Sequence, residues 1–369
     1  MSLSPLSEKS SPFATGFRRG EICVLYGAGN LGMSMVETLR AAGFLPIGFL
    51  DRQKGGECAS LPISTPESAP KEWKKLPVLI TVFNPDYHSG LKRISEDLAA
   101  CGFARIIPFE AFYQDHPGLF GENKFWLTDP AFYRGHEAEI EEVFGLFYDE
   151  KSRDLYRALI RHRLGGSWEN IPDARPVSDQ YFDPEVCRQK HFRCFVDIGA
   201  FTGDTLETAI NHGVQFDQVI AFEPDMNNLH QLCRFLNSRR EKLPGAIVIP
   251  AGVGSDNTFL SFFGGVGSSS NFSENGNSKI PVVALDEVSQ GLPIDFIKMD
   301  IEGAEMDALS GMEGIIRANR PMLAVSVYHR PEDIFRIPLH IKKHFADYRF
   351  LLRLYGEHCL DTVLYALPA

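Results

Sequence analysis

The residues best suited to chemistry lie in two glycine-containing turns, of which the second has the sequence FVDIGAFTGDT at 195–205. Asp197 ends a short apolar run there, and Gly199 and Gly203 follow in the turn. Glycine lets a ligand approach the backbone closely, and the helix expected next offers free N–H groups at its N-terminus. Glu223 follows one helix and one strand later, where a carboxylate can accept both hydroxyls of a ribose. The sequence therefore predicts a site for adenosine or a similar nucleoside.

Acidic residues around this turn distinguish between classes of nucleoside ligand. Asp197 and Asp204 would repel the pyrophosphate of a dinucleotide. S-adenosylmethionine has no phosphate, and carboxylates attract its sulfonium and ammonium groups. Asp204 and Thr205 also suit the first turn of a helix as capping residues. The turn therefore favours S-adenosylmethionine, and the alternative is a purely structural turn followed by an acid by chance.

The first turn has the pattern GxGxxG, formed by Gly27, Gly29 and Gly32, and Asp51 ends the next apolar run. This is the dinucleotide fingerprint, and alone it predicts NAD binding. Three polar residues after a further apolar run are expected to face the same cleft: Asn84, Tyr87 and His88. Only a small sheet fits into this part of the chain, however, and it offers no evident partner for hydride chemistry. A bound nucleotide, a structural domain without a ligand and true redox activity all stay open.

Composition limits the classes of protein to consider. The chain has 369 residues, which is too long for one ordinary domain of roughly 100–200 residues. Its 37 Lys and Arg against 48 Asp and Glu give a formal charge of −11, which disfavours a nucleic-acid partner. No apolar run approaches the roughly 18 residues of a membrane span, and the N-terminus has no secretory core. The seven cysteines form no CxxC pair, so we expect a soluble, cytoplasmic protein with reduced thiols.

Strand and helix patterns alternate on both sides of a helical segment. We expect a flexible tail at 1–20, a smaller Rossmann-like α/β domain at 21–112, a helical connector at 113–190 and a larger α/β domain at 191–369. The alternation implies doubly wound parallel sheets with ligands at the carboxyl ends of the strands. Strands of the larger domain are expected at 194–198, 218–222, 246–249, 294–299 and 322–327. Two β-rich runs at the end of the chain predict an antiparallel hairpin, which is typical of class I methyltransferases.

Four blocks of the sequence, in order and spacing, resemble the FkbM-type S-adenosylmethionine-dependent methyltransferases: DIGAFTGDT, AFEPD, IKMDIEGAE and VYHRPEDIFRIPLHI. The resemblance covers about residues 181–367. It implies an O-methyltransferase that acts on a sugar or glycan hydroxyl by direct displacement of the methyl group, with a general base. The acceptor would be a sugar, a glycan or a nucleotide-sugar.

The resemblance also implies how the cofactor is held. Asp197, Gly199, Ala200 and Gly203 would line its methionine part, and Glu223 would hold the ribose. The segment from Gly252 and Val253 to position 257 would lie near the adenine. The full set of expected cofactor residues is Asp197, Gly199, Ala200, Phe201, Thr202, Gly203, Asp204, Thr205, Glu223, Pro224, Gly252, Val253 and Asp300.

Catalytic candidates lie at the carboxyl ends of the fourth and fifth strands, because the protein must align the acceptor oxygen and help to remove its proton. They are Lys298, Asp300, Glu302 and His329. His329 is the first choice as general base, because an unperturbed imidazole titrates near neutrality; its alternative role is to brace a loop. Asp300 and Glu302 would orient His329, bind the acceptor or hold the amino group of the cofactor. Glu305 is expected on the solvated side of its helix.

Two patterns bear on metals. Acids at such strand ends suit Mg²⁺, but the fifth strand here ends in Tyr-His, so Mg²⁺ is not favoured and no metal site is predicted. His340 and His344 have helical i, i+4 spacing, but the glutamate of HExxH is missing. We therefore expect them to be surface histidines.

Two segments are candidate covers for the site. The glycine- and serine-rich loop at 263–279 is either a lid over the acceptor or a disordered insertion. Tyr181 and Phe182 either cover the cofactor or belong to the core.

Three functions from different classes follow. The leading one is a sugar or glycan O-methyltransferase, favoured by Asp197, Glu223, Asp300 and His329 together. The alternatives are a non-catalytic protein that binds nucleotides or nucleotide-sugars, and an NAD-dependent oxidoreductase that uses the first turn. The sequence leaves the oligomeric state open, a homodimer included.

Overall fold

The structure is a computed structural model that describes residues 16–85, 90–120, 124–263, 271–272, 278–289, 291–345 and 347–369. Contacts between residues divide the chain into two compact units. The first unit takes in the described residues of Met1–Ala138, Leu155–Ala174 and Gly356–Asp361, and the second unit those of Glu139–Asp154, Arg175–Tyr355 and Thr362–Ala369. The segment expected as a connector at 113–190 therefore contributes residues to both units.

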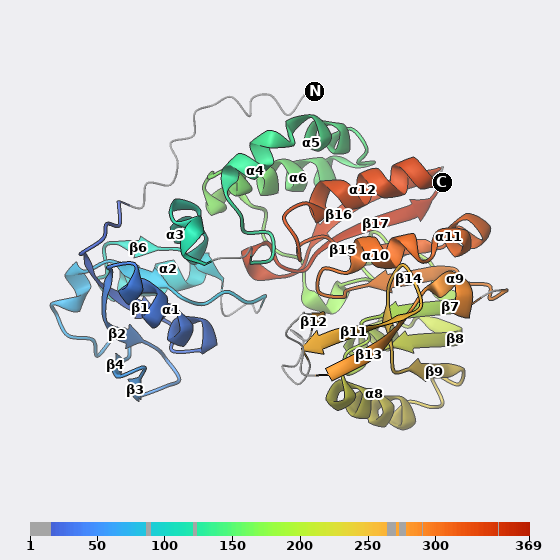
Figure 1. The fold of residues 1–369 in the computed structure, drawn as a ribbon, viewed down its shortest axis with the longest axis horizontal. Helices are drawn as coiled ribbons and strands as arrows, with labels where there is room; N and C mark the ends of the chain where they lie inside the picture. Colours follow the sequence, from blue (N-terminus) through green and yellow to red (C-terminus); the bar gives the residue numbers. More distant parts are fainter. Residues whose placement is uncertain are drawn as a thin grey trace. The chain divides into compact units, whose positions relative to one another are not determined.

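The first unit is built on a six-stranded sheet in the order β3-β4-β2-β1-β5-β6 (Figure 1). Its strands are β1 Ile22–Tyr26, β2 Leu45–Leu50, β3 Gly56–Cys58, β4 Leu61–Ser64, β5 Val78–Ile80 and β6 Ile106–Ile107. All neighbouring pairs are parallel except β3 with β4. The helices that follow the strands are α1 Asn30–Ala41, α2 Leu91–Ala100 and α3 Phe109–Asp115. Helix α2 buries one apolar stripe, in which Ile94 and Leu98 pack against the core around Val78.

Three further helices lie in the segment after α3: α4 Pro130–Gly135, α5 Glu137–Phe144 and α6 Glu150–Arg163. Asp129 caps α4 by accepting the N–H of Ala131, and Pro130 occupies the first helical position, where its missing N–H costs nothing. In α6, Leu155 and Leu159 are buried on one stripe. The α-helices of this segment end at Arg163, and the chain then reaches β7 through short 3-10 turns.

The second unit contains a seven-stranded sheet in the order β16-β17-β15-β14-β7-β8-β9. Its strands are β7 His191–Ile198, β8 Gln215–Phe222, β9 Ala246–Ile249, β14 Phe296–Met299, β15 Met322–Ser326, β16 Tyr348–Leu354 and β17 Thr362–Pro368. The five strands from β15 to β9 run parallel, and β17 is antiparallel to both β15 and β16. This confirms the predicted class I methyltransferase fold with its C-terminal antiparallel hairpin.

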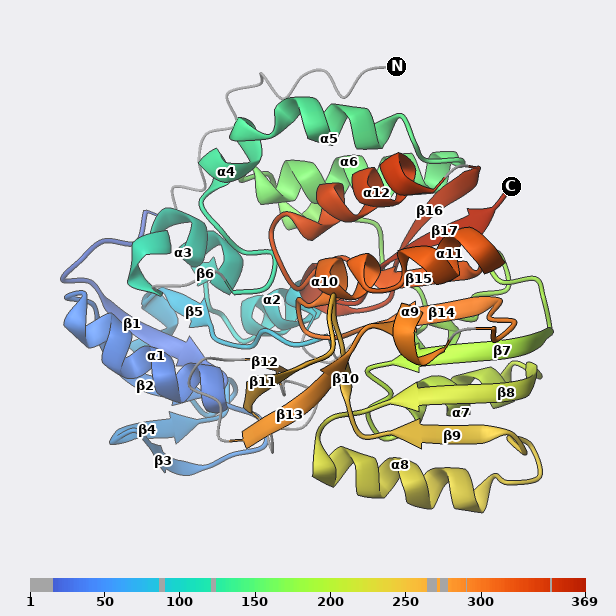
Figure 2. The ribbon, with the colours of Figure 1, turned by 45° about the vertical axis from the view of Figure 1, so that its right-hand side comes forward.

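Helices flank this sheet, and Figure 2 shows β7, β8 and β9 side by side with α8 next to β9. The helices of the second unit that position its site are α7 Asp204–Asn211, α8 Met226–Ser238, α9 Leu285–Val288, α10 Glu305–Ser310, α11 Glu313–Asn319 and α12 Asp333–His344. Among the described residues, no helix has the length and apolar character that crossing a bilayer requires.

An aromatic cluster fills the core beneath the sheet. Phe182 is fully buried, and its ring centroid lies 5.6 Å from that of Phe296 and 6.0 Å from that of Phe195. Phe195 and Phe296 pack against each other with centroids 4.9 Å apart. Such pairs add about 0.5–1.5 kcal/mol each beyond their buried area. Phe182 is therefore a core residue of the second unit, not a cover for a ligand.

A small separate sheet in the second unit has the order β10-β13-β11-β12. Its strands are β10 Gly252–Val253, β11 Thr258–Phe263, β12 Asn271–Phe272 and β13 Ser278–Val283. The segment at 263–279, for which a lid and a disordered insertion were both expected, includes β12 and the ends of two further strands. The rest of that segment, 264–270 and 273–277, lies outside the described residues.

Candidate active site

The turn between β7 and α7 requires glycine at two positions. Gly199 has a φ of +78°, and a Cβ there would lie 2.0 Å from the carbonyl oxygen of Asp300. Gly203 has a φ of +97°, and a Cβ would lie 2.5 Å from the ring of Phe235. Residues with a side chain rarely adopt such φ angles. Both the backbone conformation and the lack of space for a Cβ therefore require glycine at these two positions. The chain therefore passes close to the carboxyl end of β14 at this turn.

Asp197 and Lys298 form a buried ion pair across adjacent strands. They are paired in register on β7 and β14, and Lys298 Nζ lies 3.1 Å from Asp197 Oδ1. Lys298 Nζ also donates to the carbonyl oxygen of Gly199 at 2.6 Å. Burial alone would lower the pKa of Lys298, but Asp197 and other nearby acids raise it, so the ammonium group stays charged. The negative charge of Asp197, which the sequence suggested would attract the cofactor, is therefore neutralised by Lys298.

Glu223 lies at the end of β8, beside the same turn. One carboxylate oxygen accepts the N–H of Phe201 and the other that of Asp225, each at 2.8 Å. Burial raises the pKa of Glu223 to about 7 despite these bonds. Nδ2 of Asn228 also donates to this carboxylate, at 3.5 Å, so of its about four acceptor positions one stays open to a ribose hydroxyl.

The other expected cofactor residues differ in how deeply they are buried. Ala200, Thr205, Gly252 and Val253 are buried, and Phe201, Thr202 and Pro224 are half-buried. Asp204 is exposed in the first turn of α7. These residues lie on the β7–α7 turn, the end of β8 and strand β10.

Asp300 is held from two sides just after β14. Its Oδ2 accepts the hydroxyl of Tyr181 at 2.8 Å, and its Oδ1 lies 3.3 Å from Nε2 of His329. Glu302 approaches the same nitrogen, with Oε2 3.9 Å away, and its φ of +55° is unusual for a residue with a side chain. The structure thus brings together three of the four predicted catalytic residues, and sequence reasoning did not identify the partner Tyr181.

Glu305 is buried, which corrects the expectation that it faces solvent. Its Oε1 accepts the N–H of Ile301 at 3.0 Å and lies 2.8 Å from Nδ1 of His329. Glu305 is the first residue of α10, so its side chain turns back toward the preceding loop, and the helical pattern could not reveal this. Sequence reasoning also missed Asp333, a buried acid at the start of α12, whose pKa is raised to about 8 by burial and by Glu305.

His329 is an imidazolium in this arrangement. Burial disfavours its charged form, but Glu305, Glu302 and Asp300 outweigh burial and raise its pKa to about 10. His329 was expected to act as a general base with an unperturbed pKa, but its pKa is strongly raised. At neutral pH the ring has no free lone pair with which to accept a proton.

A metal does not fit this cluster well. Asp300, Glu305 and His329 offer ligand atoms within 4.8 Å of one another. However, Glu305 and His329 are joined by a bond that carries a proton, and Mg²⁺ prefers oxygen ligands and retained waters. The cluster is better suited to proton handling and to hydroxyl binding.

The GxGxxG turn of the first unit has a related design. A Cβ at Gly27 would lie 2.6 Å from the side chain of Val82, and one at Gly32 would lie 2.0 Å from the Gly27 carbonyl oxygen, whereas Gly29 meets nothing within 4 Å. Asp51 accepts the N–H of Ala28 at 2.9 Å, as Glu223 accepts that of Phe201 in the second unit. Partial burial would raise the pKa of Asp51, but the N–H of Ala28 and two further backbone N–H groups hold that pKa below its ordinary value. Asn84 follows β5, and Tyr87 and His88 lie outside the described residues.

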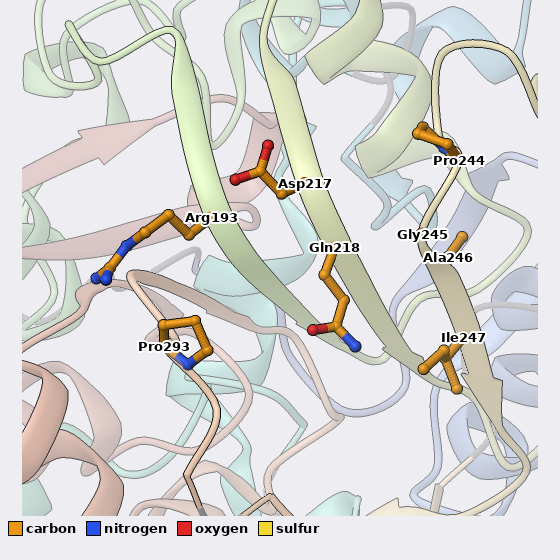
Figure 3. A pocket seen from close by; sticks show the side chains of 8 residues that line it. All are labelled: Arg193, Asp217, Gln218, Pro244, Gly245, Ala246, Ile247 and Pro293. Atoms are coloured by element: carbon orange, nitrogen blue, oxygen red, sulfur yellow. The ribbon is translucent and has the colours of Figure 1, made fainter.

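A depression of about 560 Å³ lies elsewhere in the second unit (Figure 3). Its lining includes Arg193, Asp217 and Gln218, which belong to the amino-terminal parts of β7 and β8. Ligands of open α/β sheets bind at the carboxyl ends of the strands, where Asp197 and Glu223 lie. This depression is therefore not the candidate site.

Comparison with known proteins identifies the catalytic unit. The family model for the methyltransferase FkbM domain matches residues 197–358, a segment that begins at Asp197 and includes Glu223, Asp300 and His329. Residues 197–358 are a methyltransferase FkbM domain. The protein is accordingly a methyltransferase, as the sequence predicted, and the acid cluster belongs to its FkbM domain.

Solved structures extend the likeness beyond the FkbM domain. The crystal structure of methyltransferase FkbM from Methylobacillus flagellatus KT is similar with a TM-score of 0.78 and 23% identity, over 96% of this chain and 92% of that one. At this identity the likeness shows a shared fold. A methyltransferase from Geobacter sulfurreducens matches 54% of this chain and 81% of its own, with 16% identity and a TM-score of 0.31. No curated protein matches the sequence.

Proposed function

We propose that the protein transfers a methyl group from S-adenosylmethionine to a hydroxyl group of a sugar or glycan. The observation that carries this proposal is the set of carboxylates at the carboxyl end of the second unit's sheet, together with the FkbM domain that contains them. S-adenosylmethionine supplies an activated methyl group on a sulfonium, a cation that carboxylates stabilise where a pyrophosphate would be repelled.

The cofactor would be held by the turn and the strand ends around it. Glu223 has an acceptor position left for a ribose hydroxyl, and residues 199–205 present backbone to the methionine part. Gly252 and Val253 would border the adenine. The ion pair of Asp197 with Lys298 fixes the strand ends beneath the cofactor, so Lys298 positions the site and does not take part in proton transfer.

A hydroxyl acceptor suits the acid cluster, because carboxylates accept hydrogen bonds from hydroxyl groups. The side chains of Asp300 and Glu302 are 25% and 21% exposed, so a ligand can reach both, whereas His329 is buried behind them. Asp300, fixed by Tyr181 and His329, would orient the acceptor oxygen, and Glu302 would take its proton. The sugar or glycan nature of the acceptor rests on the resemblance of the four sequence blocks.

The first unit would bind a nucleotide or the nucleotide part of a sugar acceptor. Gly27 and Gly32 are needed for close packing, whereas Gly29 faces open space at the N-terminus of α1, where a phosphate could approach the backbone. The carboxylate of Asp51 is already engaged with three backbone N–H groups. This second site would assist recognition of the acceptor.

Calorimetric titration of the full chain with S-adenosylmethionine and with NAD tests the proposal. Glu223→Gln should weaken S-adenosylmethionine binding about 10- to 100-fold, since a hydrogen bond to a charged group is worth about 1.5–3 kcal/mol. Asp51→Asn is the matched control, because it alters the equivalent carboxylate of the other turn, and it should leave this affinity unchanged. Tight NAD binding without S-adenosylmethionine binding would overturn the proposal.

The acceptor can be sought with radiolabelled methyl transfer to a panel of glycans and nucleotide-sugars. An acceptor that loses activity when one hydroxyl is replaced by hydrogen identifies the methylated position. Transfer to amines or carboxylates alone would contradict an O-methyltransferase.

A further inference from the structure

His340 and His344 meet a carboxylate from a neighbouring helix. Both lie on α12, one helical turn apart, and Glu313 is the first residue of α11. Oε1 of Glu313 lies 3.3 Å from Nδ1 of His344 and 3.9 Å from Nε2 of His340. The three ligand atoms all lie within 4.8 Å of one another. Figure 2 shows α11 and α12 close together in the second unit.

We propose that Glu313, His340 and His344 form a binding site for a divalent transition-metal ion, with Zn²⁺ as the ion that the donor set fits best. Two imidazole nitrogens and one carboxylate oxygen are common zinc ligands, and each binds the ion at about 2.0–2.2 Å. Ligand atoms around a tetrahedral ion are then about 3.3 Å apart. The observed separation at His344 already has this value, and that at His340 needs only a small side-chain movement. The third ligand, Glu313, thus comes from another helix than the two histidines.

The carboxylate of Glu313 is oriented for this role. Its Oε2 accepts a hydrogen bond from Arg317 at 2.8 Å, which leaves Oε1 directed at the two histidines. The guanidinium of Arg317 lies over the ring of Phe345 at 5.7 Å, so the side chain that holds Glu313 is itself packed. A hydrogen bond that fixes the oxygen not facing the metal is typical of carboxylate ligands.

The two imidazole rings lie side by side. Their rings are stacked, with centroids 4.4 Å apart. Nε2 of His340 is buried and has no hydrogen-bond partner among the described residues, and it is directed toward Glu313.

Such a metal would link the start of α11 to the end of α12. Three protein ligands leave a fourth position for water. The opposite end of α12 begins at Asp333, in the acid cluster of the candidate active site, so the metal would fix the far end of a helix that packs against that site. This role is structural and does not depend on the proposed reaction.

Calorimetry of the EDTA-treated full chain with ZnCl₂ tests the site. We expect one ion per chain with a dissociation constant in the micromolar range or below, and a melting temperature that rises with Zn²⁺ concentration. The double variant His340→Asn, His344→Asn should lose at least about 100-fold in affinity and the thermal shift. Glu313→Gln should weaken binding less, because both imidazoles remain.

His191→Asn is the matched control. His191 also pairs with a carboxylate, Asp217, at 2.8 Å, but no second histidine completes that pair. The His191→Asn variant should bind Zn²⁺ with the same affinity as the unaltered chain. Equal affinity in the double variant, binding only at millimolar Zn²⁺, or loss of binding in Asp300→Asn but not in the double variant would each overturn the proposal.

Discussion

The hydroxyl of Tyr181 donates a hydrogen bond of 2.8 Å to Asp300, although 119 positions separate the two residues in the sequence. The backbone of Tyr181 is fixed as well, since its N–H donates to the hydroxyl of Tyr365 at 2.9 Å and its φ is +67°. Its ring also lies over Lys298, with Nζ 5.4 Å from the centroid. Tyr181 therefore joins the buried ion pair to the acid cluster and is more than a core aromatic.

The first prediction concerns this hydrogen bond. Tyr181→Phe should lower kcat about 10-fold or more with a smaller effect on KM, because Asp300 loses the donor that fixes it for the acceptor. Steady-state kinetics with a saturating methyl donor would measure the separate effects on kcat and KM. Tyr348→Phe is the matched control, since it also removes one hydroxyl bond, of 2.9 Å to the carbonyl oxygen of Pro321, but away from the cluster. Equal kinetic effects of the two variants would refute the role of Tyr181.

The second prediction is the pH dependence of the reaction. If the imidazolium of His329 positions the carboxylates, kcat/KM should rise as the carboxylates ionise and then fall as the pH approaches about 10, where His329 loses its proton. Initial rates between pH 5 and pH 10.5 would reveal this shape. A rate that instead increases tenfold per pH unit up to about 10 would show that neutral His329 is the base.

The third prediction links His329 to stability. Its folded pKa of about 10 exceeds its ordinary value of 6.5, so the folded chain binds the proton more tightly than the unfolded chain. The contribution is fully present below about pH 6.5 and is lost as the pH rises through about 10. It should amount to a few kcal/mol, because each pKa unit corresponds to about 1.4 kcal/mol.

Urea unfolding at several pH values would test this contribution. The free-energy difference between the unaltered chain and His329→Gln should be largest near pH 6 and should shrink toward pH 10. Asp333, with a raised pKa of about 8, contributes in the same direction, and His329 itself lowers that pKa, so the difference reports His329 together with its effect on Asp333. A difference that stays constant with pH would contradict the buried imidazolium.

The larger sheet could be predicted from the sequence because its strands are short apolar runs separated by helical patterns and glycine turns. Predicted strand ends were accurate at the carboxyl edge, where Asp197 and Glu223 follow buried runs. They were less accurate at the amino edge of β7, where His191 and Arg193 alternate with buried Phe192 and hide the strand. The FkbM domain was recognisable because its motifs fall on the strand ends and turns.

The electrostatics of the site could not be predicted, because they depend on contacts between distant segments. Nothing in the local pattern indicates that Glu305 turns inward to meet His329, or that Asp333 is buried beside them. For the same reason the i, i+4 pair on α12 was assigned to the surface, since its third potential ligand, Glu313, comes from another helix. Sequence reasoning identified residue types and ends of elements, and the structure was needed for pairings.

The last prediction separates the two reasons for glycine in the β7–α7 turn. Gly199 and Gly291 both have a φ of +78°, but a Cβ at Gly291 would meet nothing within 4 Å, whereas one at Gly199 would lie 2.0 Å from the Asp300 carbonyl oxygen. Gly291→Ala should therefore lower the free energy of unfolding only by the cost of a left-handed conformation for alanine, about 1–2 kcal/mol. Gly199→Ala must in addition push the β7–α7 turn away from the end of β14, so it should cost at least about 3 kcal/mol. Because Asp300 moves with that strand end, Gly199→Ala should also abolish S-adenosylmethionine binding under conditions where it still folds, and Gly291→Ala should not. Equal losses of stability in the two variants, measured by urea unfolding, would mean that the conformation alone selects glycine at this turn.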